Sequence, residues 1–426
     1  MKISRRKFLR DSAIAAAGLS VSALAGCGAA SGSTPAAAPT QAPTPAPTPS
    51  PTPEPPYDAD VLTGEKRSAD AKDSRIIGVM VNNMANTSRQ NARPQRGLSS
   101  AKMLMEIKVE GGITRFCALY DDIDQIPEVG PIRSGRDQFL QLLIPWQALY
   151  YHDGESVFCT RYIKDWEYWD LNIGGKSYFD TPTHSLVAHR DKRGRDVAVE
   201  HTEFTSGEEI QKAVDKAGID MTRHYNSTFF IFADYRYGQY NDLAGCDSAI
   251  SVTLRHSSSY RTYFDYDEST KLYMMSQYSP AAKSISDTCD ELNGQHLGFT
   301  NLVVLFTSIA AYPGDSHDIQ NVDYRYGGVG YYFTNGRAKY ILWRKGAPNT
   351  GLLILEPDSV EDECVMVNPG KTYLAVIDLD EYDNFHYEGN EDASVEDDLT
   401  GAGNVSSVGE SEEDGDVDAA GSINTN

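Results

Sequence analysis

The sequence predicts an α+β protein with a mixed α/β N-terminal domain and a β-rich C-terminal domain. In the first half of residues 58–385, strand patterns alternate with amphipathic helix patterns. The second half contains mostly short strand patterns separated by turn signals. The whole stretch is long for one domain and suits two.

Residues 1–27 have the features of an export signal. SRRKFL (4–9) is a twin-arginine pattern, and the apolar stretch 13–25 that follows is too short and mild to span a membrane. LAGC (24–27) resembles a bacterial lipobox, which implies cleavage before Cys27 and lipidation of that residue. Two or three acyl chains anchor a protein stably. We therefore expect a lipid anchor on the extracytoplasmic face of the cell membrane; the alternative is a plain secretory signal.

The two ends of the mature chain have compositions that disfavour a packed core. Residues 28–57 are rich in Ala, Thr and Pro, and ten of the chain's twenty prolines lie there. A Pro-rich linker extends about 3.1 Å per residue, so it holds the folded body away from the membrane. Residues 386–426 contain twelve Asp and Glu and no Lys or Arg, which predicts a disordered acidic tail.

The charge balance excludes one class of partner. The formal net charge is −23; the tail carries −12 and residues 1–57 carry +3, which leaves −14 for the folded body. Nucleic-acid binding needs a basic face, so we expect no nucleic-acid partner. Five cysteines follow Cys27 without a Cys-x-x-Cys pair, and we find no metal-ligand spacing and no cofactor motif.

Three segments of the first half have clear local signals. RIIGVMVNN (75–83) predicts a buried strand, and 134–143 predicts a helix capped by Ser134. Residues 206–218 predict a clearer helix: its first and fourth residues, Ser and Glu, form a capping box, and a glycine ends it.

The second half predicts strands and hairpins. Residues 260–278 indicate two strands around a polar turn, and 301–309 indicate a buried strand. Residues 330–343 predict a hairpin with Asn-Gly at its tip. Residues 364–377 predict another, which turns at Asn-Pro-Gly-Lys.

Several of these segments resemble the YerB-like lipoproteins, a bacterial family whose domains have no known function. The family motifs N-A-R-P-Q-x-G-L, E-x-x-x-E-G-G-I-T-R-F, G-P-V-R-S-x-R and H-x-G-x-S are matched at residues 91–98, 106–116, 130–136 and 152–156. The resemblance implies a two-domain α+β lipoprotein without an established activity. We place the N-terminal domain at 58–235 and the C-terminal domain at 245–382. One departure is Glu-His-Thr at 200–202, where the family usually has Pro-His-Asn.

The stretch EIKVEGGITRF (106–116) carries the candidate site. Its alternation predicts a strand, and Gly-Gly predicts a two-residue hairpin turn. In that register Lys108 faces Arg115, and Glu106 and Glu110 share their face.

This charged face has two interpretations. It can be a solvated set of ion pairs, each worth under about 1 kcal/mol. It can also be the floor of a polar pocket whose arginines hold a ligand carboxylate bidentately, as in a peptide stem or an acidic sugar. The candidate binding residues are Glu106, Glu110, Arg115, Arg133, Arg136 and His152.

Two functions follow, and the sequence favours the non-catalytic one. It is a binding or scaffolding lipoprotein at the membrane and cell-wall interface, with peptidoglycan or an envelope protein as its partner. The alternative is a cell-wall-modifying hydrolase with Glu110 as its acid, Arg115 and Arg133 as substrate-binding residues, and Asp153 as a second catalytic candidate. Glu106 and Glu110 are about 13 Å apart along a strand, too far for a glycosidase pair at roughly 5–9.5 Å.

Overall fold

The computed structural model describes residues 59–67, 74–175, 183–222, 229–237, 239–357, 359 and 362–389. The predicted export signal, Cys27 and the linker lie outside this part of the chain, as does the tail from residue 390. Within the described ranges, no helix is long and apolar enough to cross a membrane.

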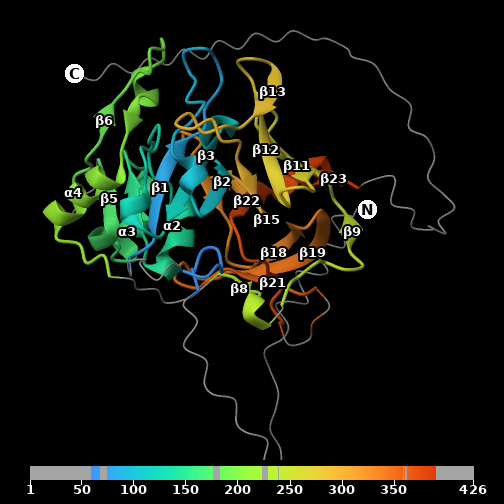
Figure 1. The fold of residues 1–426 in the computed structure, drawn as a ribbon. Coiled ribbons are helices and arrows are strands. Elements are labelled where there is room, and N and C mark those ends of the chain that lie inside the picture. Colours follow the sequence, from blue (N-terminus) through green and yellow to red (C-terminus); the bar gives the residue numbers. More distant parts are fainter. Residues whose placement is uncertain are drawn as a thin grey trace, which may run out of the picture. The chain divides into compact units, whose positions relative to one another are not determined.

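A mixed sheet of eleven strands forms the centre of the fold (Figure 1). Its strand order is β20 (Leu353–Leu355), β19 (Arg337–Arg344), β18 (Gly328–Thr334), β15 (Asn301–Thr307), β22 (Thr372–Asp378), β2 (Met103–Lys108), β3 (Thr114–Tyr120), β1 (Ile77–Asn82), β4 (Leu149–His152) and β5 (Asn172–Gly174), with β9 (Asp247–Ser248) beside β19. β22 and β2 pair in parallel, with Met103 opposite Thr372. Strands from both halves of the sequence therefore share one sheet.

A second, antiparallel sheet packs against one face of the first. Its order is β13 (Ser284–Asp287), β12 (Leu272–Ser279), β11 (Arg261–Asp267), β10 (Ser251–Arg255) and β23 (His386–Glu388), with β14 (Gly298–Phe299) beside β12. Three two-stranded pairs complete the described strands: β16 (Ile309–Ala311) with β17 (Gln320–Val322), β21 (Met366–Val367) with β8 (Ile231–Phe232), and β6 (His189–Arg190) with β7 (Glu203–Phe204).

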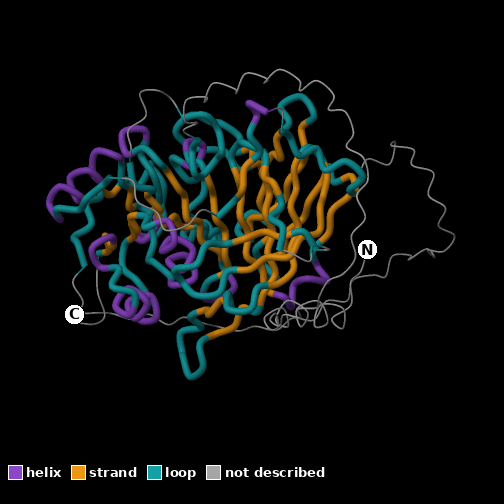
Figure 2. The backbone as a smooth tube through the Cα atoms, turned by 90° about the horizontal axis from the view of Figure 1, so that it is seen from below, coloured by secondary structure: helices purple, strands orange, loops and turns teal. Residues whose placement is uncertain are grey.

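Two hydrophobic cores lie on opposite faces of the large sheet because its central strands are buried on both sides. One contains Met105 and Cys117 with residues of α2 (Asp137–Leu143) and α3 (Val157–Asp165). The other contains Phe116 with residues of α4 (Gly207–Ala217) and of the second sheet. Figure 2 shows most of the helices on one side of the described body and most of the strands on the other. The fold is therefore α+β, and this confirms the class predicted from the sequence.

Elements with strong local signals form as predicted. The Ser206 side chain accepts a hydrogen bond from Glu209 N at the start of α4, and Gly218 ends the helix at φ 69°. The Asn-Gly hairpin joins β18 and β19, with Thr334 opposite Arg337.

Three other predictions are wrong. α2 begins at Asp137 after an Arg136 N-cap, so Ser134 does not cap it. β21 and β22 do not form a hairpin: β22 lies between β15 and β2, parallel to both, because its buried apolar run suits a central position. The acidic tail begins later than residue 386, because the Tyr387 ring packs against Phe333.

Candidate functional site

The hairpin with the candidate site has a different register from the predicted one. Its turn is the three-residue loop Glu110–Gly112, closed by a 2.8 Å backbone hydrogen bond between its flanking residues. Both glycines have positive φ (63° and 69°), which lets the chain close over three residues. Arg115 consequently pairs with Ile107 instead of Lys108. A one-residue shift moves side chains to the other face, so Arg115 and Glu106 do not share a face.

Glu106 is a fully buried carboxylate with four hydrogen-bond donors. Its Oε1 accepts from Asn83 Nδ2 at 3.1 Å and from Thr114 Oγ1 at 2.7 Å. Its Oε2 accepts from Thr262 Oγ1 at 2.9 Å and from Tyr373 OH at 2.6 Å. The solvated-surface interpretation is therefore wrong for Glu106, which ties the two sheets together.

Glu110 forms an internal ion pair with two of the predicted arginines. Arg136 donates to its Oε1 from Nε at 2.5 Å and to its Oε2 from Nη2 at 2.9 Å, and Arg115 Nη2 lies 3.6 Å from Oε2. Burial alone would raise the pKa of Glu110, but the two arginines more than offset it, and the pKa is lowered. A general acid at neutral pH needs a raised pKa. Glu110 therefore lacks the property that the hydrolase hypothesis requires.

His152 lies in the core, where its ring contacts Tyr150. Its side chain is fully buried, with Nδ1 2.7 Å from Gly154 O and Nε2 2.8 Å from Asn172 Oδ1. Burial lowers the pKa of His152. A Cβ at Gly174 would lie 2.4 Å from the imidazole ring, so this position requires glycine. These contacts make His152 an internal residue that joins β4 and β5.

Arg133 and Asp153 lie at the edge of the same cluster. Arg133 is half-buried, and burial lowers its pKa, as does the charge of Arg136. Asp153 shares a hydrogen bond with the carboxyl of Glu203. Burial raises the pKa of Glu203, and this hydrogen bond raises it further. The structure thus brings Glu110, Arg115 and Arg136 into direct contact and gives Asp153 a different partner.

The loop of residues 83–97, which contains the N-A-R-P-Q motif, lines a pocket of about 400 Å³. Asn91 and residues 93–95 form one side of it, and Gln277 of β12 with residues 286–289 forms the other. Figure 1 shows the blue loop rising near the yellow β12–β13 hairpin. Backbone hydrogen bonds, such as Ala281 N to Ala85 O at 2.9 Å, connect the loop to that hairpin. The pocket therefore lies between the two halves of the sequence.

Arg93 is the cationic group of this pocket. It donates from Nε to Asn83 Oδ1 at 2.9 Å and from Nη1 to Tyr278 O at 2.8 Å. Within the described part of the chain, Nη2 has no hydrogen-bond partner and no carboxylate is paired with the guanidinium. Burial lowers the pKa of Arg93, although Tyr260 and Glu106 oppose this effect. The Asn83 amide lies between this guanidinium and the Glu106 carboxylate, which therefore act on each other without direct contact. A guanidinium with an unpaired nitrogen at a pocket favours an anionic ligand group.

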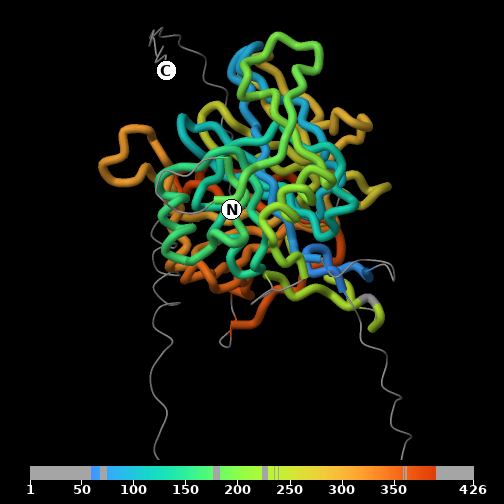
Figure 3. The backbone as a smooth tube through the Cα atoms, turned by 90° about the vertical axis from the view of Figure 1, so that its left-hand side faces the viewer, coloured from blue at the N-terminus to red at the C-terminus, as the bar shows by residue number. Residues whose placement is uncertain are grey.

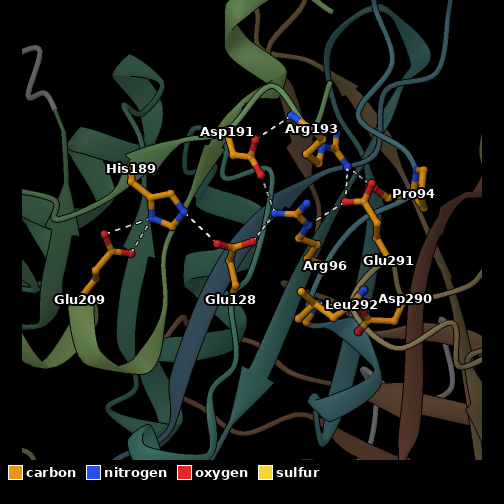
Figure 4. Close-up of polar contacts among 11 residues, drawn as sticks. Pro94, Arg96, Glu128, His189, Asp191, Arg193, Glu209, Asp290, Glu291 and Leu292 are labelled. Carbon is orange, nitrogen blue, oxygen red and sulfur yellow. Dashed lines mark hydrogen bonds and ion pairs between the residues drawn. The ribbon is translucent and has the colours of Figure 1, made fainter. Parts of the chain in front are cut away.

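Ion pairs hold the outer side of the loop in place (Figure 4). Arg193 donates to Pro94 O at 2.5 Å and to Glu291 Oε2 at 3.0 Å. Arg96 donates to the same Glu291 oxygen at 2.7 Å and to Asp191 Oδ2 at 2.9 Å. Figure 3 shows the segment that contains Asp191 and Arg193 in green, beside the blue loop. This segment fixes the backbone that presents Arg93 to the pocket.

The network continues away from the pocket to a histidine. Arg96 also pairs with Glu128, whose second oxygen lies 2.8 Å from His189 Nε2. His189 Nδ1 lies 3.0 Å from Glu209 of α4 (Figure 4). Burial alone would lower the pKa of His189, but Glu209 and Glu128 raise it. Figure 4 shows the imidazole between the two carboxylates, an arrangement that favours its charged form.

Arg93 and Gln277 are not among the site residues predicted from the sequence. The arginine within the N-A-R-P-Q motif is a signal that could have identified Arg93. Gln277 gives no such signal, because it occurs in an ordinary strand pattern and meets the loop only in the folded chain. The hydrogen bond from Arg93 to Tyr278 spans 185 residues of sequence.

The described residues contain no cluster of three or more His, Cys, Asp or Glu with a geometry suited to a metal ion. The cysteines among them, Cys117, Cys159, Cys246, Cys289 and Cys364, are free thiols.

Comparisons with known proteins agree with the resemblance. Residues 62–220 match the N-terminal domain, and 250–374 the C-terminal domain, of a family described as "Protein of unknown function (DUF3048)". "Putative lipoprotein YerB" of Bacillus subtilis (strain 168) is 26% identical over 326 residues, which are 75% of this chain and 86% of that protein. The crystal structure of YerB from Bacillus subtilis is similar at a TM-score of 0.59 and 23% identity, covering 76% of this chain and 97% of that one. The chain therefore belongs to the YerB-like family of lipoproteins with DUF3048 N- and C-terminal domains.

Proposed function

We propose that this protein is a non-catalytic, lipid-anchored binding protein of the cell envelope. It takes a polar ligand with an anionic group into the pocket between loop 83–97 and the β12–β13 hairpin. The observation that carries this proposal is the guanidinium of Arg93, which lies at the pocket with Nη2 unpaired within the described residues.

The predicted anchor supports an extracytoplasmic location. Lipid on Cys27 and the Pro-rich linker would hold the pocket outside the membrane, where peptidoglycan and envelope proteins are accessible. The similar Bacillus subtilis protein bears the name of a lipoprotein, which agrees with this placement.

The test is binding of the purified full-length protein, in detergent, to isolated cell-wall sacculi and to soluble wall fragments. Arg93→Met removes the cation at the pocket. Arg89→Met is its matched control, because Arg89 belongs to the same loop but its side chain is 68% exposed and pairs only loosely with Asp196, at 3.6 Å. We expect a loss of at least tenfold in affinity for Arg93→Met and little change for Arg89→Met.

A third variant separates binding from folding. Arg93→Lys keeps the charge and should keep part of the affinity, while the melting temperature of each variant shows whether the loop is still in place. Equal binding by the parent and a folded Arg93→Met would refute the proposed site. Release of soluble wall products by the parent would refute the non-catalytic role.

A further inference from the structure

Gln277 is a buried amide whose hydrogen-bonding groups are unused. Gln277 is one of the residues that line the pocket, it is 2% exposed, and neither Oε1 nor Nε2 has a partner among the described residues. Thr288, which lies on the same side of the pocket, has a buried Oγ1 that also lacks a partner among the described residues. A buried polar atom without a partner costs about 1–3 kcal/mol. Three such atoms belong to residues that line one pocket, and this favours a ligand that donates and accepts hydrogen bonds.

We propose that the ligand of this pocket is a short peptide in an extended conformation, which Gln277 recognises by its backbone. This inference rests on the proposed function and specifies its ligand class. In an extended chain, the N–H and C=O of one residue point to the same side, as they do in the hydrogen-bonded pairs of an antiparallel sheet. One glutamine amide can accept from that N–H with Oε1 and donate to that C=O with Nε2.

The charges of the pocket suit the two ends of such a peptide. Arg93 offers the unpaired Nη2 to a carboxylate, and Asp287 of β13 offers a carboxylate to an amine. Among the described residues, the Asp287 side chain accepts one hydrogen bond, at Oδ1 from Ser276 Oγ at 3.2 Å. A volume of about 400 Å³ lies within the roughly 300–1,000 Å³ of small-ligand pockets.

Other ligand classes match these groups less well. An inorganic anion offers only acceptors, so it would leave Gln277 Oε1 unpaired. A hydrocarbon ligand would bury Gln277, Thr288 and Arg93 without partners, at a high cost. A sugar can donate and accept, and for that reason it is included in the test.

The experiment is titration calorimetry of the full-length protein with tri-alanine, whose small side chains leave the backbone and the two charged ends to be recognised. The comparison ligand is its depsipeptide, in which an ester oxygen replaces the central N–H. Acetate, inorganic phosphate and N-acetylglucosamine are the other probes. We expect tri-alanine to bind, and the depsipeptide to bind about tenfold more weakly.

Gln277→Met should remove that difference, so that it binds the two peptides with equal affinity. Gln211→Met on the surface of α4 is the control and should keep the difference, because the exposed Gln211 amide donates to Asp215 on the same helix and does not line the pocket. The peptide comparison needs no variant, so it stays informative even if Gln277→Met does not fold.

The outcomes separate the two proposals. If acetate or phosphate binds through Arg93 and tri-alanine binds no better than its depsipeptide, the peptide inference is overturned and the proposed function stands. Tighter binding of N-acetylglucosamine than of tri-alanine also overturns it. Binding of none of the probes, together with no Arg93-dependent binding to wall material, overturns both.

Discussion

Replacing Glu106 by glutamine tests the internal tie between the two sheets. Each oxygen of the Glu106 carboxylate accepts hydrogen bonds from two donors. A glutamine oxygen can keep Asn83 and Thr114, but its amide nitrogen then faces the hydroxyls of Thr262 and Tyr373. These hydroxyls can rotate to accept, so part of the energy is recovered. Hydrogen bonds to a charged group contribute about 1.5–3 kcal/mol each, and we expect Glu106→Gln to lower the free energy of unfolding by about 2–4 kcal/mol.

The assay is equilibrium unfolding in urea, with a double-mutant cycle that includes Tyr373→Phe. Tyr373→Phe should cost less in the Glu106→Gln background than in the parent, by about 1 kcal/mol or more, because the two residues share one hydrogen bond. Glu208→Gln on the surface of α4 is the control and should change the urea midpoint little, because the ion pair of Glu208 with Lys212 is exposed. Strictly additive effects, or a Glu106→Gln variant as stable as the parent, would refute the role of Glu106 as a hydrogen-bonded hub.

Three further changes test other parts of the fold. His201 is buried, which lowers its pKa from 6.5 to about 4. The unfolded chain therefore binds the proton more tightly than the folded protein does. The stabilising contribution of His201 is present above pH 6.5 and is lost as the pH falls toward 4. The melting temperature of the parent should therefore fall more than that of His201→Gln between pH 7 and pH 5, and parallel curves would contradict this. The pKa of His189 is shifted in the opposite direction, because it is raised in the folded protein. Its stabilising contribution is therefore present below pH 6.5 and lost as the pH rises through the folded pKa. His189→Gln should consequently lower the melting temperature more at pH 5.5 than at pH 8.5. Gly207→Ala would place a Cβ 2.1 Å from the carbonyl oxygen of Ile123, and overpacking against backbone should cost about 1–3 kcal/mol in urea unfolding. An unchanged midpoint would show that the segment around Ile123 can move away from α4.

The sequence determined the features that depend on neighbouring residues. The capping box of α4 and its terminal glycine act within one helix, so residues 206–218 define that helix without tertiary context. The Asn-Gly turn of the β18–β19 hairpin is equally local. The motifs at 91–98 and 106–116 also identified the family from the sequence alone.

The tertiary structure decided which strands pair and which charges meet. A buried apolar run has the same pattern in a hairpin and between two parallel strands, and so β22 was assigned the wrong partner. The register around Gly111 depended on one residue of loop length, which moved Arg115 away from Glu106. The pocket needs Arg93 from one half and Gln277 from the other. Local patterns carry no information about such a contact, because it forms only when the two sheets pack.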